Sequence, residues 1–393
     1  MMPLPDTTLA AVTTGARRTE LRELPVPPVA ADSGLLQVEA AGVCGADVRS
    51  YERDAPVRVM GHENVGYIAA IGAAAAARWG VGEGDRVVLE EYLPCGHCRF
   101  CRSAEFRFCL ASDASANPDA IRYGSTAVDT APGLWGGYSQ YMYLHPNTVV
   151  HRLPGSIPAT VASLALPLGN GYEWACRYGE AGPGKTVVIF GPGQQGLGCV
   201  IAARAAGADR VILTGLPADR RRLEVGKLLG ADEVLVAGGD GTREAIMAAT
   251  GGAGADTVID TAAGSTQTLT LALEVLRKQG ILVVPAASAE PLDGLPFGRI
   301  TRKCITVRGA RGHSYHAVEW ALRLMAGGRY PLAEMCSLEC GLDQVDRAIR
   351  GTGGELDVPV IHAAVLPGLE TGGAAPGGAA PGSTGPAAGA GHR

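Results

Sequence analysis

The chain lacks any long apolar run. Its 393 residues are 47% hydrophobic, yet no stretch reaches the roughly 20 uncharged apolar residues that a membrane-spanning helix needs. No apolar signal segment follows Met1, and without one we expect no export into an oxidising compartment. The predicted location is therefore cytoplasmic, with no membrane partner.

Positive charge is also not in excess. The sequence has 34 Lys and Arg against 39 Asp and Glu, a net charge of −5, with both signs mixed along the chain. Such a balance offers no basic surface for nucleic acid. We therefore expect a small-molecule partner, bound by a chain long enough to form two domains.

Large apolar side chains are nearly missing from the end of the chain. From Leu366 the sequence reads "LPGLETGGAAPGGAAPGSTGPAAGAGHR", and burial of such residues could not offset the entropy lost on ordering them. Residues 365–393 are predicted to be a disordered tail. The first fourteen residues are too irregular for us to assign an element.

Four closely spaced cysteines are the strongest chemical signal. The segment "PCGHCRFCRSAEFRFC" can bring four thiolates to one tetrahedral zinc, held by Cys95, Cys98, Cys101 and Cys109. The lobe around them, about residues 92–112, has little apolar material, so a structural zinc would fix its shape. Disulfides are the alternative, and the scattered positions of the remaining cysteines, such as Cys176 and Cys304, oppose it.

A βαβ unit begins at Thr186. The sequence "TVVIFGPGQQGLGCVIAARAAGADRVILTG" contains a β-branched run, a glycine turn, a small-residue helix and a second β-branched run. Its turn is a G-x-G-x-x-G motif, typical of the pyrophosphate site of a dinucleotide. The turn residues are Gly191, Gly193, Gln194, Gln195 and Gly196. Further strands are predicted at 233–237, 257–261 and 281–286.

The choice of dinucleotide depends on the end of the second strand. An acidic residue there would bind the ribose 2′-OH of NAD, but this chain has Thr214 and Gly215. Three arginines follow that could meet a 2′-phosphate: Arg220, Arg221 and Arg222. They favour NADP(H) over NAD(H), although Asp219 could turn inward and reverse the preference.

Together with "GVCGADV" and "VMGHENVGYIAAIG" in the first hundred residues, these features resemble the zinc-containing medium-chain dehydrogenase/reductase family. The similarity covers about residues 15–364. It implies an α/β protein with a GroES-like β-barrel catalytic domain (1–154), a Rossmann domain with a doubly wound parallel sheet (155–300) and a return to the catalytic domain (301–364). It also implies a homodimer or homotetramer.

The resemblance further implies a catalytic zinc in the cleft between the domains. Carried over by motif, its ligands are Cys44 and His62, with Glu63 beside the metal and Asp47 orienting the imidazole. Arg49 and Tyr51 would line the same cleft, and His313 and His316 begin the segment that returns to it.

Three positions depart from the family pattern. The position expected for a third ligand holds Leu166, which cannot coordinate zinc. Ala46 stands where many members have a hydroxyl that takes the alcohol proton, and Arg49 stands where a relay histidine is frequent. A shifted alignment would instead make Glu173 the third ligand.

These residues leave three functions open. The first is an NAD(P)-dependent dehydrogenase that interconverts an alcohol and a carbonyl compound, with an atypical catalytic zinc. The second is a zinc-independent reductase of an activated C=C or C=N bond, in which Arg49 would stabilise developing negative charge. The third is a nucleotide-binding protein without catalytic activity.

Overall fold

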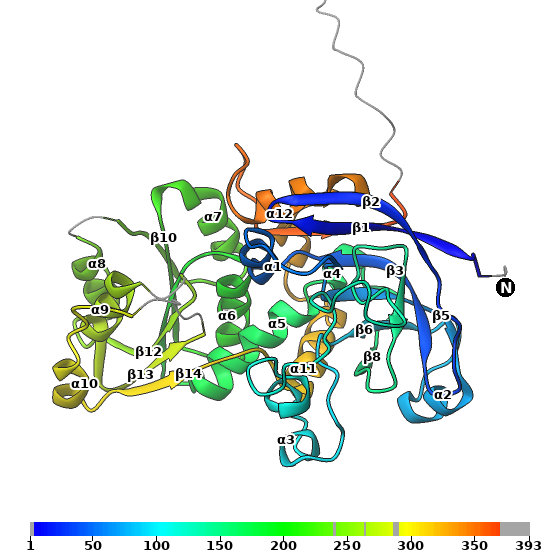
Figure 1. Ribbon diagram of the computed structural model, residues 1–393. Coiled ribbons are helices and arrows are strands. Elements are labelled where there is room, and N and C mark those ends of the chain that lie inside the picture. Colours follow the sequence, from blue (N-terminus) through cyan, green and yellow to red (C-terminus); the bar gives the residue numbers. More distant parts are fainter. Residues whose placement is uncertain (1–3, 239–240, 263–264, 286–290, 370–393) are drawn as a thin grey trace, which may run out of the picture.

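The computed structural model describes residues 4–238, 241–262, 265–285 and 291–369. Two large sheets lie at opposite ends of the molecule, and the helices α5, α6 and α11 lie between them (Figure 1). Strands from both ends of the chain share the sheet on the N-terminal side, while the middle of the chain forms the other. Of the predicted tail, residues 370–393 lie outside the described residues.

The middle of the chain forms a six-stranded sheet in which every pair is parallel. The strands run in the order β11-β10-β9-β12-β13-β14, the arrangement of a doubly wound dinucleotide-binding fold. Their bounds are β9 (Thr186–Phe190), β10 (Arg210–Gly215), β11 (Glu233–Val236), β12 (Ala255–Asp260), β13 (Leu276–Val284) and β14 (Thr306–Gly309). The connecting helices are α6 (Gln194–Ala205), η4 (Pro217–Asp219), α7 (Arg220–Leu228), α8 (Thr242–Ala249), α9 (Thr266–Val275) and α10 (Gly298–Lys303).

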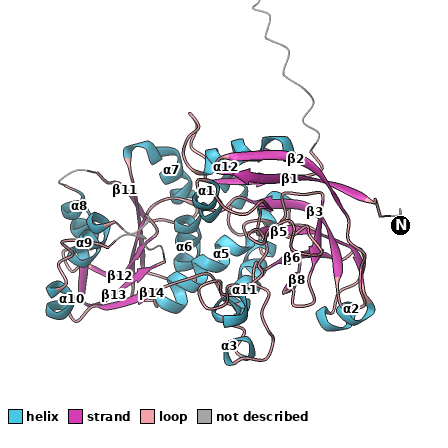
Figure 2. Cartoon of the chain, viewed as in Figure 1, coloured by secondary structure: helices cyan, strands magenta, loops and turns pink. Residues whose placement is uncertain are grey.

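The central strand shows why a parallel sheet forms. From Val187 to Phe190 every side chain of β9 is buried, as expected for a strand covered by helices on both faces (Figure 2). The predicted α/β fold class is confirmed. The sixth strand, β14, extends this sheet past the boundary predicted at residue 300, so the chain leaves the sheet later than we expected.

The remaining strands form two antiparallel-rich sheets. One has seven strands, in the order β15-β16-β3-β5-β6-β8 with β7 paired to β3, and the other has three, in the order β2-β1-β4. Their bounds are β1 (Thr7–Gly15), β2 (Arg18–Pro25), β3 (Gly34–Gly42), β4 (Arg58–Val59), β5 (Glu63–Ile71), β6 (Arg86–Leu89), β7 (Tyr141–Leu144), β8 (Val150–Arg152), β15 (Cys336–Cys340) and β16 (His362–Val365). Because β16 pairs with β3, the chain does return to this side after the parallel sheet.

Helices complete the two sides and join them. Near the antiparallel sheets lie α1 (Gly45–Tyr51), α2 (Ala73–Trp79), α3 (Arg99–Arg102), η1 (Phe106–Phe108), η2 (Leu110–Ser112), η6 (Leu342–Gln344) and α12 (Val345–Thr352). The junction contains α4 (Ala159–Ala162), α5 (Ala165–Tyr172), the π-helix η3 (Glu173–Tyr178), α11 (Tyr315–Ala326) and η5 (Leu332–Met335).

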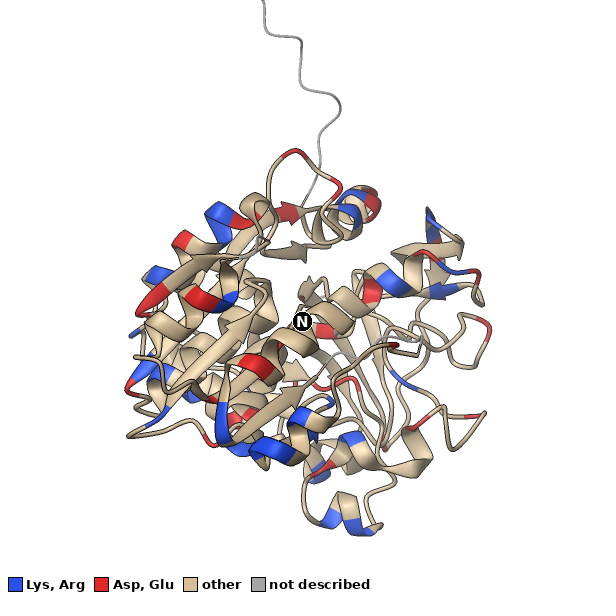
Figure 3. Ribbon diagram, turned by 90° about the vertical axis from the view of Figure 1, so that its left-hand side faces the viewer, with Lys and Arg blue, Asp and Glu red and all other residues tan. Residues whose placement is uncertain are grey.

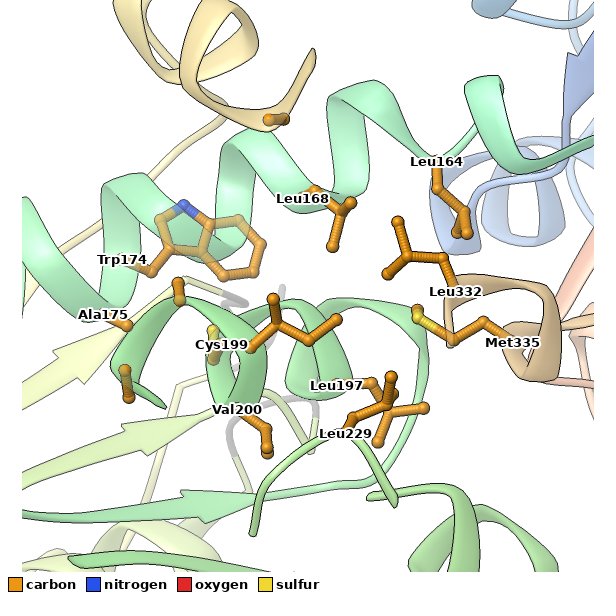
Figure 4. Packing of buried hydrophobic residues seen from close by; sticks show 14 of the residues in the cluster. Leu164, Leu168, Trp174, Ala175, Leu197, Cys199, Val200, Leu229, Leu332 and Met335 are labelled. Carbon is orange, nitrogen blue, oxygen red and sulfur yellow. The ribbon is translucent and has the colours of Figure 1, made fainter. Parts of the chain in front are cut away.

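A continuous apolar core crosses this junction. Leu168 and Trp174 pack above α6, near Leu197 and Cys199, while Met335 approaches from η5 (Figure 4). The same cluster contains Val65 of the antiparallel sheet and Val187 of the parallel sheet, so burial holds the two sides together.

Charged residues of both signs are interspersed over the fold (Figure 3). None of the helices in the described part of the chain combines the length and apolar character that crossing a bilayer requires.

Candidate active site and metal centres

The four-cysteine lobe gathers all its sulfur atoms in one place. The Sγ atoms of Cys95, Cys98, Cys101 and Cys109 lie within 4.8 Å of one another. Burial opposes ionisation of Cys95, but backbone N–H groups of His97 and Cys98 lower the pKa of its thiol. All ten cysteines of the chain are free thiols, which excludes the disulfide alternative in this structure. Four sulfur donors without a competing bond fit a closed zinc site.

A second group of metal-binding atoms forms around the start of β5. One ligand atom each from Cys44, His62 and Glu63 lies within 4.8 Å of the others. Cys44 is the N-cap of α1 and Glu63 is the first residue of β5. Gly61, with φ of +91°, makes the turn before His62, and a Cβ atom there would meet the Tyr138 ring at 2.6 Å. The ligand atoms from the start of α1 and the start of β5 therefore lie close together.

Asp47 orients the histidine of this group. Its Oδ1 lies 3.3 Å from His62 Nδ1, while its Oδ2 accepts hydrogen bonds from Cys44 N at 2.9 Å and from the Tyr138 hydroxyl at 3.3 Å. The contact to Nδ1 leaves Nε2 of the imidazole for a metal. We did not predict Tyr138 at this site, because it comes from a distant segment of the chain.

Glu63 carries an unpaired buried oxygen. Its Oε2 has no hydrogen-bond partner among the described residues, and burial raises the pKa of this carboxyl to about 8. Burial also raises the pKa of Cys44, and Glu63 adds to that effect. For His62, burial acts to lower the pKa, but Asp47 and Cys44 raise it well above its usual value.

These donors fit a zinc ion. Thiolate, imidazole and carboxylate are ligands that zinc takes, and a cation would supply the orphaned oxygen with a partner and lower the pKa of each ligand. Three protein ligands would leave a fourth position for a substrate oxygen.

The structure does not bring every predicted residue to this group. Arg49 is exposed on α1. Tyr51 is buried on the opposite side of the helix, where burial and a hydrogen bond to Asp346 of α12 raise the pKa of its phenol. One helical turn cannot direct both side chains toward Cys44, so for Tyr51 we correct the expected role in the cleft.

Leu166 is buried in the core of α5 and offers no ligand atom. Glu173, the ligand of the shifted alignment, lies elsewhere: its Oε1 is 2.7 Å from Arg107 Nη2 and its Oε2 accepts a hydrogen bond from Ser314 Oγ at 2.8 Å. Its carboxylate is therefore already neutralised in a buried network that joins the cysteine lobe to the junction helices.

The two histidines of the returning segment differ in position. His313 is buried, with Nδ1 at 3.0 Å from Asn170 Oδ1, whereas His316 is exposed beside Tyr315. Asn170 in turn donates to Gln195 Oε1 at 3.2 Å. His313 is thus linked to the glycine turn rather than to the Cys44 group.

The glycine turn has the geometry of a pyrophosphate site. Gly191 has a φ of +92° and makes the turn after β9. The space around Gly193 is open, whereas a Cβ at Gly196 would come within 1.9 Å of Gly191 O. In this motif the first glycine makes a tight turn, the second lets the ligand approach the backbone, and the third lets the helix pack closely against the strand. The helix α6 starts directly after this turn, at Gln194, with no side-chain cap, and the N–H groups of a first helical turn can bind phosphate.

At the end of β10 an acidic residue lies close to the strand. A Cβ at Gly215 would lie 3.1 Å from Asp219 Cβ, while Thr214 is buried. The Asp219 carboxylate accepts a hydrogen bond from Leu216 N at 2.9 Å and pairs with Arg222 at 2.8 Å.

The other two arginines are placed differently. Arg221 pairs with Glu334 at 3.0 Å, but Arg220 has no ion-pair partner in the described part of the chain. Beyond Leu216, a cavity of about 650 Å³ reaches Gly238 and the start of α8 and α9. It opens at the carboxyl edge of the sheet, where nucleotides bind in this fold.

Comparison with known proteins gives the same family for both parts of the chain. Residues 30–155 match the model of the alcohol dehydrogenase GroES-like domain, and residues 196–327 match that of the zinc-binding dehydrogenase.

Relatives match nearly the whole chain. A protein named probable alcohol dehydrogenase of Mycobacterium tuberculosis is 37% identical over 91% of this chain and 98% of its own length. A sorbitol dehydrogenase of Bacillus subtilis is 30% identical over 88% of this chain and 95% of its own. The crystal structure of an alcohol dehydrogenase from Thermotoga maritima has a TM-score of 0.78 at 25% identity, covering 92% of this chain and 99% of that one. The chain therefore belongs to the zinc-containing medium-chain dehydrogenase/reductase family and is an NAD(P)-dependent oxidoreductase of the alcohol dehydrogenase type.

Proposed function

We propose that this enzyme interconverts small alcohols or polyols and their carbonyl compounds at a zinc ion held by Cys44, His62 and Glu63. The observation that carries the proposal is the convergence of these three ligand atoms around an unpaired buried carboxylate oxygen. A relative that is named a sorbitol dehydrogenase supports polyols as one substrate class. A second, structural zinc would occupy the four-cysteine lobe.

When bound, zinc would polarise the substrate oxygen as a Lewis acid, and NAD(P) would exchange a hydride with the substrate carbon. The residues of the chain position these groups. Asp47 fixes the His62 ring, and its hydrogen bond from Cys44 N holds the start of α1 against it. The glycine turn and the start of α6 hold the pyrophosphate.

The alcohol proton needs a route other than the usual hydroxyl relay. Position 46 is an alanine whose N–H donates to Cys44 Sγ at 3.5 Å, and Arg49 is exposed. We propose that the proton leaves to solvent at the open side of the site, where the His62 side chain is 13% exposed.

The preferred cofactor in this proposal is NADP(H). The Asp219 carboxylate is already occupied by Leu216 N and Arg222, while Arg220 at the start of α7 has no partner among the described residues. A 2′-phosphate would meet this guanidinium favourably. An Arg220→Ala variant should lose about tenfold or more in kcat/KM with NADP and little with NAD; equal losses would reject this preference.

The same proposal includes a homodimer or homotetramer and a reducing, cytoplasmic location. The exposed edge strand β14, with Val307 46% exposed, is a candidate for pairing between copies. Light scattering of wild type and a Val307→Lys variant tests this, since the variant should shift toward the monomer.

The decisive test of function is turnover of a panel of primary alcohols, secondary alcohols and polyols, by wild type and Cys44→Ala, with both NAD and NADP. We expect oxidation by the wild type and a loss of about 10³-fold or more in the variant, the effect of several kcal/mol of transition-state stabilisation. Reduction of activated C=C or C=N compounds at equal rates in both proteins would support the zinc-independent alternative, which Leu166 and Ala46 favour. Tight cofactor binding without turnover of any substrate would support the non-catalytic alternative.

A further inference from the structure

A buried histidine connects three distant parts of the chain. His362, the first residue of β16, is fully buried. Its Nδ1 lies 2.6 Å from Gln194 Oε1, and its Nε2 lies 2.7 Å from Ser163 Oγ. Gln194 is the first residue of α6 in the dinucleotide-binding part, and Ser163 lies between α4 and α5. One imidazole thus contacts the glycine turn, the junction and the antiparallel sheet.

The chemistry of these contacts fixes their direction. An amide oxygen can only accept, so the contact to Gln194 Oε1 requires the proton on Nδ1. For a neutral ring, Nε2 is then the acceptor, and Ser163 donates to it. Gln194 keeps its Nε2 group without a partner among the described residues. His362 therefore sets which end of the buried Gln194 amide is held, at the first residue of α6 directly after Gly193.

The other side of the imidazole lies next to the proposed metal pocket. A Cβ atom on Gly42 would be 2.8 Å from His362 Cε1 and 2.4 Å from Glu63 Oε2. Gly42 pairs with Glu63 in one ladder and with Ala364 in the other. Only a residue without a side chain leaves room for both groups. The imidazole and the Glu63 carboxylate consequently approach the same point on β3.

We propose that His362 is a positioning residue for the cofactor, because it holds Gln194 in place at the start of α6. It is not a metal ligand in this account, since both ring nitrogens are engaged. Removing the Nδ1 contact should release the first turn of α6 and weaken cofactor binding, with little change in metal content.

Two substitutions separate this role from packing. His362→Asn places an amide near the Nδ1 position and can still reach Gln194, whereas His362→Gln places its amide near the Nε2 position and can reach only Ser163. Ser163→Ala is the matched control that removes the Nε2 contact. The measurement is the Kd for NADH and NADPH by fluorescence titration, with zinc content and Tm recorded on the same samples.

We expect His362→Gln to raise the Kd of the preferred cofactor about tenfold, and His362→Asn and Ser163→Ala to raise it less than about threefold. In a double-mutant cycle, Gln194→Ala should add nothing to His362→Gln. The proposal is overturned if His362→Gln binds cofactor as tightly as wild type, or if the losses of the two histidine variants follow their Tm values alone. If wild type retains cofactor but oxidises no alcohol, the proposed substrate class fails while this inference stands.

Discussion

The two candidate metal sites differ in how their ligands are assembled. The cysteine lobe draws four sulfur atoms from residues 95–109, and every ligand is local. The second site draws Cys44 from the start of a helix and His62 and Glu63 from the start of a strand, and it depends on Asp47 and Tyr138 to orient them. Four protein ligands fill every position around a metal in the first site. Three protein ligands leave one position in the second site open to a substrate.

Their surroundings differ in the same sense. The buried ion pair of Arg107 and Glu173 attaches the lobe to the junction helices. Loss of the metal from the lobe should therefore destabilise the fold. The Cys44 group keeps an unpaired oxygen on Glu63, which is costly in a folded chain without a ligand. We infer that the first site stabilises the structure and the second carries the chemistry.

The largest effect is expected when the closed site is broken. Cys109 is fully buried, and its Sγ accepts a hydrogen bond from Cys95 N at 3.3 Å. Cys109→Ala should lower the free energy of unfolding by more than about 3 kcal/mol through loss of the metal. Chemical denaturation measures this. A variant as stable as the wild type would show that the lobe needs no metal.

A smaller loss should follow when the lobe keeps its ligands but loses its anchor. Glu173→Gln removes one of the two carboxylates that pair with the buried Arg107 at 2.7 Å and leaves only Glu105, so we expect about 2 kcal/mol of destabilisation with normal zinc content. Arg177→Ala is the control. Its side chain is 43% exposed although it also contacts Glu173, and it should cost about 1 kcal/mol or less. Equal losses in the two variants would contradict the role of burial.

Weakening the open site should change activity and leave the fold intact. In Asp47→Asn the His62 ring loses its carboxylate partner, and loss of the group that orients a ligating histidine costs about 10- to 100-fold in metal affinity or activity. Zinc titration and kcat/KM measure the effect, and Tyr138→Phe, which removes one hydrogen bond to Asp47, should give a smaller one. If Asp47→Asn unfolds the protein instead, the site is structural as well.

The smallest effect concerns pH and a histidine that belongs to neither site. Burial acts to lower the pKa of His151, but hydrogen bonds to Glu319 and Glu90 raise it. Its stabilisation is therefore fully present below the unfolded pKa of about 6.5 and is lost as the pH rises through the higher folded pKa. Denaturation of the wild type and His151→Gln between pH 6 and 9 should show this slope only in the wild type. Identical slopes would assign the pH dependence to other groups.

The sequence predicted the features whose signals are local. The cysteine lobe and the glycine turn each lie within one short segment, and the apolar runs of the parallel sheet gave strands near 233–237, 257–261 and 281–286, observed as β11, β12 and β13. The strand β1 was missed because its small residues, such as Ala10 and Ala11, show no alternation. Both are buried because the strand pairs with β2 and β4.

Contacts between distant residues could not be read in this way. Helical geometry directs Tyr51 toward α12, and an ion pair holds Glu173 near Arg107. The link from His362 to Gln194 joins positions 168 residues apart and has no motif. Such details depend on how the two sides pack, which a pattern along the chain does not contain.

The central claim is that one complete and one incomplete site each hold a metal. Elemental mass spectrometry of protein purified without added zinc, for wild type and Cys44→Ala, tests it most directly. We expect about two zinc ions per chain in the wild type and about one in the variant, with the fold unchanged. About one zinc ion in both proteins would contradict it, because only the cysteine lobe would then be filled.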